Sequence, residues 1–154
     1  MEITAAGEPD LEALLDLWGD LAAFHARLDP AFTPSPGWRA AYRGYLSSML
    51  NREDARVLVG RVQGTVAGYA VGRITILPPF FAERRRGFIQ DVFTREGHRR
   101  QGVARRLVQE ILEWLREEQI ATVELTVASA NTEAIRLWER LGFQVYMQHF
   151  KRTL

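Results

Sequence analysis

The sequence predicts an α/β (α+β) fold, with a mixed central sheet, in one domain spanning residues 1–154. Two observations carry this prediction. Apolar residues follow helical spacing up to about residue 50, then alternate in the manner of strands, and return to helical spacing after Gly102. The chain also contains no linker, internal repeat or low-complexity segment, and 154 residues suit a single domain.

Local signals place the boundaries of each element. Asp29-Pro30 ends the first helix because proline cannot continue it, and Ser35-Pro36 is typical of a helix start. Gln63-Gly64 suits a hairpin turn, and Gly142 suits a helix C-terminus. The predicted order β-α-α-β-β-β-α-β-α-β comprises a strand at 2–5, helices at 9–28 and 35–49, a hairpin at 57–76, a strand at 88–94, a helix at 102–115, a strand at 121–127, a helix at 131–141 and a strand at 143–150.

Composition excludes several classes of function. There is no cysteine, which rules out disulfides and a cysteine nucleophile, and three scattered histidines predict no metal site. The N-terminus does not resemble a signal peptide, and no apolar run reaches the roughly 20 residues that a membrane span needs. With a net charge of +1, we expect a cytoplasmic protein that binds neither nucleic acid nor membrane.

The segment from Asp91 to Leu107 carries the clearest chemical signal. A strand enters a polar turn that opens directly into an amphipathic helix. The first backbone N–H groups of such a helix are unpaired and attract anions, and Gly102 lets a ligand approach the backbone. Arg99, Arg100 and Arg105 add positive charge, so a diphosphate fits. The competing interpretation is a plain strand–helix connection with surface arginines; the nucleotide-binding patterns GxxxxGK[ST] and GxGxxG do not occur.

Two motifs resemble those of the GNAT superfamily of N-acetyltransferases. Arg99-Arg-Gln-Gly102-Val-Ala104 resembles its [QR]xxGx[GA] signature, and the stretch from Asn131 to Gly142-Phe143 resembles its second block, NxxAxxx[Y]xxxGF. The motifs occur in the family's order and separation. The resemblance implies a sheet of six to seven strands with about four helices, in which the strands at 88–94 and 121–127 splay apart.

The resemblance also implies acetyl-CoA as the cofactor, with CoA as the product. The loop and helix start would hold the diphosphate, the main chain of the preceding strand would bind the pantetheine arm, and an N–H near Val92 or Phe93 would polarise the thioester. Asn131 matches a family asparagine that contacts the cofactor, and it also suits a helix N-cap. The implied cofactor-binding residues are Val92, Phe93, Thr94, Arg99, Arg100, Gln101, Gly102, Val103, Ala104, Arg105, Asn131 and Trp138.

Trp138 departs from the family pattern, because many members have tyrosine there to protonate the departing thiolate. An indole cannot act as that acid, and core packing is the alternative role of Trp138. Water or Tyr146 is left as the proton donor.

The catalytic candidates are Asp91 and Gln90, at the position of an acidic pair in relatives that acetylate diamines. Asp91 is either a general base or a structural or amine-orienting residue. Glu83, His25 and Asp29 are the other candidate bases, and water-mediated deprotonation is a further alternative. Strand alternation puts Gln90 and Val92 on one face and Asp91 on the other, unless a β-bulge reverses the parity.

For the acceptor we expect His25, Asp29 and Phe80 to contribute. Trp38, Tyr42 and Tyr45 either form an aromatic pocket for a cationic or aromatic amine or belong to the core.

The predicted function is transfer of an acetyl group to a primary amine of a small molecule, by direct attack in a ternary complex. The alternatives are acetylation of a protein N-terminus or lysine, and a non-catalytic acyl-CoA-binding module. The resemblance further implies a homodimer.

Overall fold

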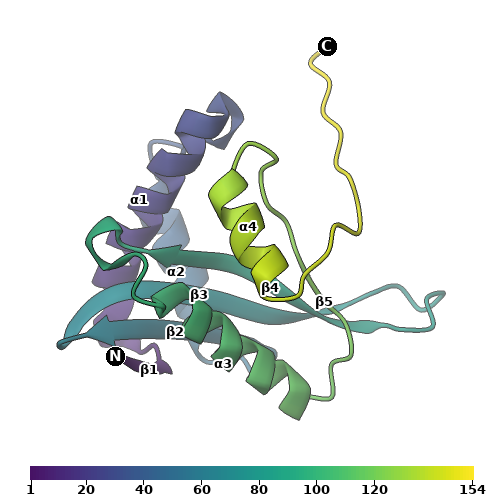
Figure 1. Ribbon diagram of the computed structural model, residues 1–154, viewed down its shortest axis with the longest axis horizontal. Helices are drawn as coiled ribbons and strands as arrows, with labels where there is room; N and C mark the ends of the chain where they lie inside the picture. The colour runs from purple at the N-terminus through teal and green to yellow at the C-terminus, as the bar shows by residue number, and fades with distance from the viewer.

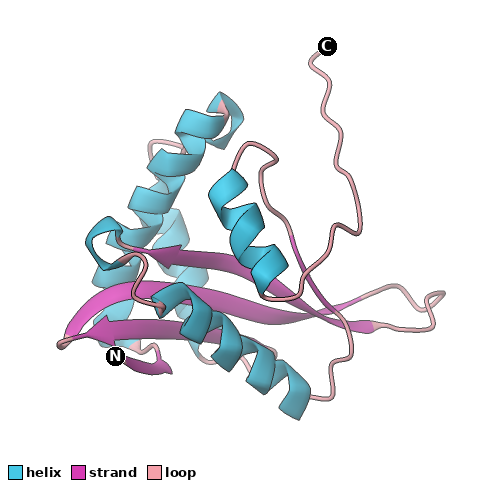
Figure 2. Ribbon diagram, in the orientation of Figure 1, coloured by secondary structure: helices cyan, strands magenta, loops and turns pink.

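A five-stranded mixed sheet forms the centre of the protein in the computed structural model, which describes residues 1–154 (Figure 1, Figure 2). The strands are ordered β1-β2-β3-β4-β5; β1 to β4 are antiparallel, and β5 runs parallel to β4. The strands are β1 (Glu2–Ala5), β2 (Ala55–Val62), β3 (Thr65–Ile76), β4 (Arg85–Thr94) and β5 (Val123–Leu125). The helices are α1 (Leu11–Leu28), α2 (Trp38–Leu50), α3 (Val103–Glu117) and α4 (Thr132–Arg140), with short 3₁₀ turns at Glu8–Asp10, Pro30–Phe32 and Glu96–His98.

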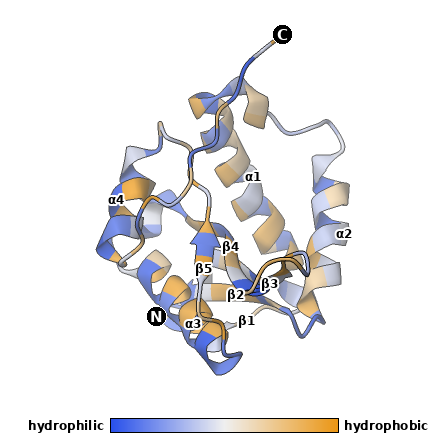
Figure 3. Ribbon diagram, turned by 90° about the vertical axis from the view of Figure 1, so that its right-hand side faces the viewer, coloured by the Kyte–Doolittle hydropathy of each residue, from blue (hydrophilic) through white to orange (hydrophobic).

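Helices cover both faces of this sheet, and each face has its own core. Figure 3 shows α1 and α2 on one side of the strands and α3 and α4 on the other. The first core joins the leucines of α1 to Val59, Tyr69 and Val71, and the second joins the apolar stripe of α3 to Ala70 and Ile89. A sheet buried on both faces explains why β3 is nearly continuously apolar. No helix is both long and apolar enough to cross a membrane.

The predicted β2–β3 hairpin is confirmed. Gln63 and Gly64 both have positive φ, at 50° and 80°, as a two-residue type I′ turn requires. Two helices begin later than predicted. Helix α1 begins at Leu11, after a 3₁₀ turn, and α2 begins at Trp38, since Ser35 and Pro36 belong to the preceding loop.

The predicted final strand is wrong, and the sheet has five strands rather than six or seven. Gly142, with a φ of 88°, ends α4, and Phe143 folds back so that its ring packs edge-on against Trp138. The chain then leaves as an exposed, extended segment (Figure 1), and residues 144–154 make no backbone–backbone hydrogen bond. Alternation predicts a strand, but a strand also needs an edge to pair with, and within this chain the segment finds none.

Candidate functional site

The loop between β4 and α3 has a conformation suited to an anion. Arg100 and Gly102 have positive φ, at 61° and 82°, and Gly102 forms the N-cap of α3. A Cβ atom built on Gly102 would meet no atom within 4 Å, so the backbone at this point faces open space. The glycine that the sequence singled out therefore has both the left-handed geometry and the access that a backbone-bound ligand requires.

The backbone donors of this loop are free. The first helical hydrogen bond of α3 runs from the N–H of Arg106 to the carbonyl of Gly102, at 3.0 Å. The backbone N–H groups of residues 100–105 precede it and donate no hydrogen bond to a backbone or side-chain acceptor. These six N–H groups lie at the positive end of α3, which is the arrangement that binds phosphate groups elsewhere.

Charged side chains surround the loop. The exposed residues Arg100 and Arg105 belong to it, and the Arg99 guanidinium lies over the Phe93 ring at 5.9 Å. The Nε of Arg99 also donates to the carbonyl of Thr94, at 3.4 Å. Arg99 therefore connects the loop with the end of β4.

Next to this loop, β4 and β5 separate. They pair only from Gly87 with Val123 to Ile89 with Leu125, where β5 ends. From residue 90 to Thr94, β4 pairs with β3 alone, which leaves its other edge without a strand partner. The expected splay is present, and the open edge leads directly to the loop before α3 (Figure 1). Val92, Phe93 and Thr94 lie on this open stretch.

A β-bulge brings Gln90 and Asp91 to the same side of the sheet. Val71 pairs with Asp91 and Gly72 pairs with Ile89, so Gln90 is the extra residue. Ile89 faces the core under α3, whereas both Gln90 and Asp91 accept hydrogen bonds from α2. Simple alternation would have placed them on opposite faces, and the bulge reverses the parity at Asp91.

Asp91 lies between α1 and α2, close to the open edge of β4. The Tyr42 hydroxyl donates to its Oδ2 at 2.7 Å, and the Tyr45 hydroxyl donates to Oε1 of Gln90 at 2.5 Å. Burial raises the pKa of Asp91, although the bond from Tyr42 and the nearby His25 act in the opposite direction. Burial likewise lowers the pKa of His25, against the pull of Asp91. The pair therefore combines a carboxyl of raised pKa with an imidazole of lowered pKa.

One member of this group, Tyr69, was not predicted from the sequence. Its side chain is fully buried in the core on the α1 side of the sheet, and its hydroxyl has no hydrogen-bond partner. Burial and the charge of Asp91 raise the pKa of this phenol far above its usual range, so it stays protonated. A tyrosine in the otherwise aliphatic stretch Gly68-Tyr69-Ala70-Val71 was the available signal.

The second predicted motif lies on α4. Oδ1 of Asn131 accepts a hydrogen bond from the Ala134 N–H at 3.2 Å, so Asn131 is an N-cap as expected. Trp138 packs against the core under α3 and contacts the ring of Phe143 at 5.4 Å. Tyr146 lies on the exposed C-terminal segment beside Arg86.

Two predicted acceptor residues lie apart from Asp91. Asp29 caps the 3₁₀ turn after α1 and forms an ion pair with Lys151. Phe80 is 80% exposed and packs on Phe81 in the loop between β3 and β4, which projects from the sheet (Figure 1). In that loop Glu83 forms a 3.9 Å ion pair with Arg86. Of the predicted acceptor residues, the structure brings only His25 close to Asp91.

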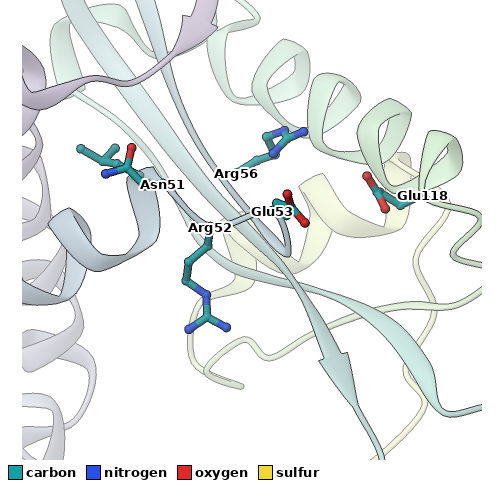
Figure 4. A pocket seen from close by; sticks show the side chains of 6 residues that line it. Asn51, Arg52, Glu53, Arg56 and Glu118 are labelled. Carbon is teal, nitrogen blue, oxygen red and sulfur yellow. The ribbon is translucent and has the colours of Figure 1, made fainter.

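The surface has two notable hollows. One, of about 420 Å³, is polar and mixes positive and negative charges; it is lined by Leu50, Asn51, Arg52, Glu53, Arg56 and Glu118 (Figure 4). It contains none of the predicted site residues. The other, of about 320 Å³, is largely aromatic and includes Tyr42 and Tyr45, the two tyrosines bonded to Asp91 and Gln90.

Known proteins resemble this chain in fold and in family. No curated protein matched the sequence. The fold resembles a mutant of the BH1408 protein from Bacillus halodurans (TM-score 0.89, 22% identity, 100% of both chains). It also resembles an aminoglycoside antibiotic 6′-N-acetyltransferase from Acinetobacter haemolyticus (0.76, 19%, 100% and 99%) and an aminoglycoside N-acetyltransferase in complex with CoA (0.76, 18%, 99% and 93%). At these identities the similarity is one of fold. The model of the acetyltransferase (GNAT) family matches residues 20–143, and the chain belongs to this family.

Proposed function

We propose that the protein transfers the acetyl group of acetyl-CoA to a primary amine of a small molecule. The single observation that carries this proposal is the continuity of three features. Free backbone donors at residues 100–105 meet the open edge of β4, and that edge ends at the buried carboxyl of Asp91. A diphosphate, an extended pantetheine arm and a reacting amine need these environments in this order. The CoA complex of a structurally similar N-acetyltransferase supports the same cofactor.

In this proposal, residues 100–105 bind the diphosphate and Val92 to Thr94 bind the pantetheine arm through their main chain. Bound acetyl-CoA supplies a thioester, and the amine nitrogen forms a bond to its carbonyl carbon while the C–S bond breaks. The amine binds as an ammonium and loses one proton to Asp91 before attack; the raised pKa of Asp91 makes it a stronger base than an exposed aspartate. The second proton, which the nitrogen loses on attack, passes through water to the departing sulfur. Tyr42 holds the carboxyl in place through its 2.7 Å bond.

Trp138 does not supply the second proton, which goes to the departing sulfur. A thiol with a pKa near ~8.5 leaves as a thiolate at pH 7 at a cost of only about 2 kcal/mol, so water is a sufficient donor. The packing of Trp138 against Phe143 gives the residue a structural role instead.

We expect sequential kinetics with small primary amines. Release of the CoA thiol should depend on the amine, and double-reciprocal plots at several acetyl-CoA concentrations should intersect, because both substrates must be bound before transfer. Parallel lines, or an acetylated protein detected by mass spectrometry, would contradict direct attack. Binding of acetyl-CoA with no turnover of small amines, peptide N-termini or lysines would favour the non-catalytic binding module.

We also propose that the protein is a homodimer in which residues 144–154 pack against a second copy. Val145, Met147 and Phe150 in this segment are exposed, and β5 is an edge strand. Light scattering after size exclusion should therefore give twice the 17.6 kDa mass of the chain. Removal of residues 144–154 should give a monomer, and a full-length chain that is monomeric at micromolar concentration would refute the proposal.

A further inference from the structure

The largely aromatic hollow, which is lined by the two tyrosines that donate to Asp91 and Gln90, points to the kind of amine that the site accepts. We call it the aromatic groove. Trp18 stacks on Tyr42 at 4.5 Å between ring centroids and tilts against Trp38 at 4.8 Å, and Tyr42 stacks on Tyr45 at 5.8 Å. All four aromatic side chains are partly exposed. The groove is lined by Trp18, Pro34, Ser35, Trp38, Ala41, Tyr42 and Tyr45.

Two residues of the groove contact the Asp91–Gln90 pair. The hydroxyls of Tyr42 and Tyr45, which line the groove, end on Asp91 and Gln90. On α1, Trp18 and His25 are two helical turns apart and lie on one stripe, and the charge of Asp91 acts on His25. Asp91 therefore lies between the helices whose aromatic side chains form the groove.

The other carboxylates of α1 are not available to a cationic ligand in the groove. Glu12 pairs with Arg39 and Arg43, at 2.8 and 2.9 Å, and Asp16 pairs with Arg39 at 2.9 Å. Asp20 is exposed, but it follows Trp18 by two residues and so lies on the opposite side of the helix.

At the far end of α1, Asp29 pairs with Lys151, and its pKa is lowered chiefly by that contact. The groove is therefore lined by aromatic and small side chains with no carboxylate among them, and the carboxyl bonded to one of its tyrosines, Asp91, has no ion-pair partner.

From this balance of aromatic surface and charge, we infer that the acceptor is a monoamine with an aromatic body, such as an arylalkylamine. The inference rests on the proposed function for the transfer step. The ring of the acceptor stacks on the aromatic groove while its one ammonium group reaches Asp91. A polyamine or an aminoglycoside would place further ammonium groups in the groove, where no free carboxylate is available to pair with them. Arg39, which lies over the Trp38 ring at 5.9 Å, would also repel these groups.

The inference is tested first by binding. Calorimetric titration of the CoA-saturated protein should give a Kd for 2-phenylethylamine at least tenfold lower than for spermidine or kanamycin. Thiol release from acetyl-CoA should show the same order in kcat/KM. Tighter binding or faster turnover of either polycation would overturn the inference, even with the proposed function intact.

Two surface variants locate the binding site without disturbing the core. Ser35→Arg adds a positive charge at the exposed rim of the groove and should weaken 2-phenylethylamine binding at least fivefold, with acetyl-CoA binding unchanged. Ala40→Arg adds the same charge on the opposite side of α2, at another exposed position, and should have no effect. Equal effects of the two variants would place the amine elsewhere and refute the inference.

A third variant tests the contribution of the ring itself. Trp38→Phe keeps an aromatic surface and should retain most of the affinity, whereas Trp38→Ala should lose it, provided that the variant retains the wild-type circular dichroism. If 2-phenylethylamine binds with this pattern but is never acetylated, the groove assignment stands and the proposed transfer reaction fails. If other amines are acetylated without preference for aromatic bodies, only the inference fails.

Discussion

Gly102→Glu should abolish measurable acetyl-CoA binding. Gly102 has a φ of 82° and faces open space, so the new carboxylate would project into the region where residues 100–105 present their N–H groups. Two like charges about 4 Å apart near a protein surface repel by about 4 kcal/mol, which predicts a loss of at least a hundredfold in affinity. Isothermal titration with acetyl-CoA and with CoA measures this loss directly.

The structure supplies a matched control for this variant at Gly64. It also has a positive φ, at 80°, and also has no atom within 4 Å of a built Cβ, but it lies in the β2–β3 turn. Gly64→Glu therefore carries the same backbone strain, about 1–2 kcal/mol, without a charge in the loop. Equal losses of affinity in both variants would mean that strain, rather than the site, accounts for the effect.

Asp91→Asn should reduce kcat/KM for the amine on the order of 10²–10⁴-fold while leaving acetyl-CoA binding unchanged. The amide keeps an oxygen to accept the bond from Tyr42 but cannot take a proton from the amine. Thiol-release kinetics measure the first effect and titration the second. Unchanged turnover in the variant would remove Asp91 from the role of base.

The pH dependence of kcat/KM gives an independent measurement of the pKa of Asp91. Because burial raises the pKa of Asp91, the acidic limb of kcat/KM in the wild type should lie above the ordinary aspartate value of about 3.9. Asp91 has an ordinary pKa in the unfolded state and a raised pKa in the folded state. At a pH between these two values the folded state keeps a proton on Asp91 that the unfolded state has released, so the free energy of unfolding falls as the pH rises through this range. Asp91→Asn removes this dependence, and the variant should be at least as stable as the wild type at neutral pH.

The parts of the fold that depend on neighbouring residues were predictable from the sequence. The β2–β3 turn, the loop before α3 and the N-cap at Asn131 each follow from a few adjacent residues, and the structure contains all three. The strand at 143–150 was predicted wrongly from an equally clear local pattern. Its pairing depends on a distant edge, about which alternation within the segment carries no information.

The site shows the same division between local and distant information. The loop glycine could be identified from its motif, but the side of the sheet on which Asp91 lies depends on the bulge at Gln90, and therefore on the register with β3. Sequence alternation alone gives the opposite face. The burial of Tyr69 likewise depends on how α1 and α2 close over the sheet, which the composition of β3 cannot indicate.

The separation of the two cores by the sheet has a consequence for how new specificities arise. Most residues of the aromatic groove belong to α1 and α2, whereas α3, which begins at the cofactor loop, packs in the core on the far face. Substitutions that reshape one face are screened from the other by the layer of strands between them. A library of variants at exposed positions of α1 and α2 should therefore change the amine specificity while the acetyl-CoA site is retained. One scaffold could in this way be adapted to many amines.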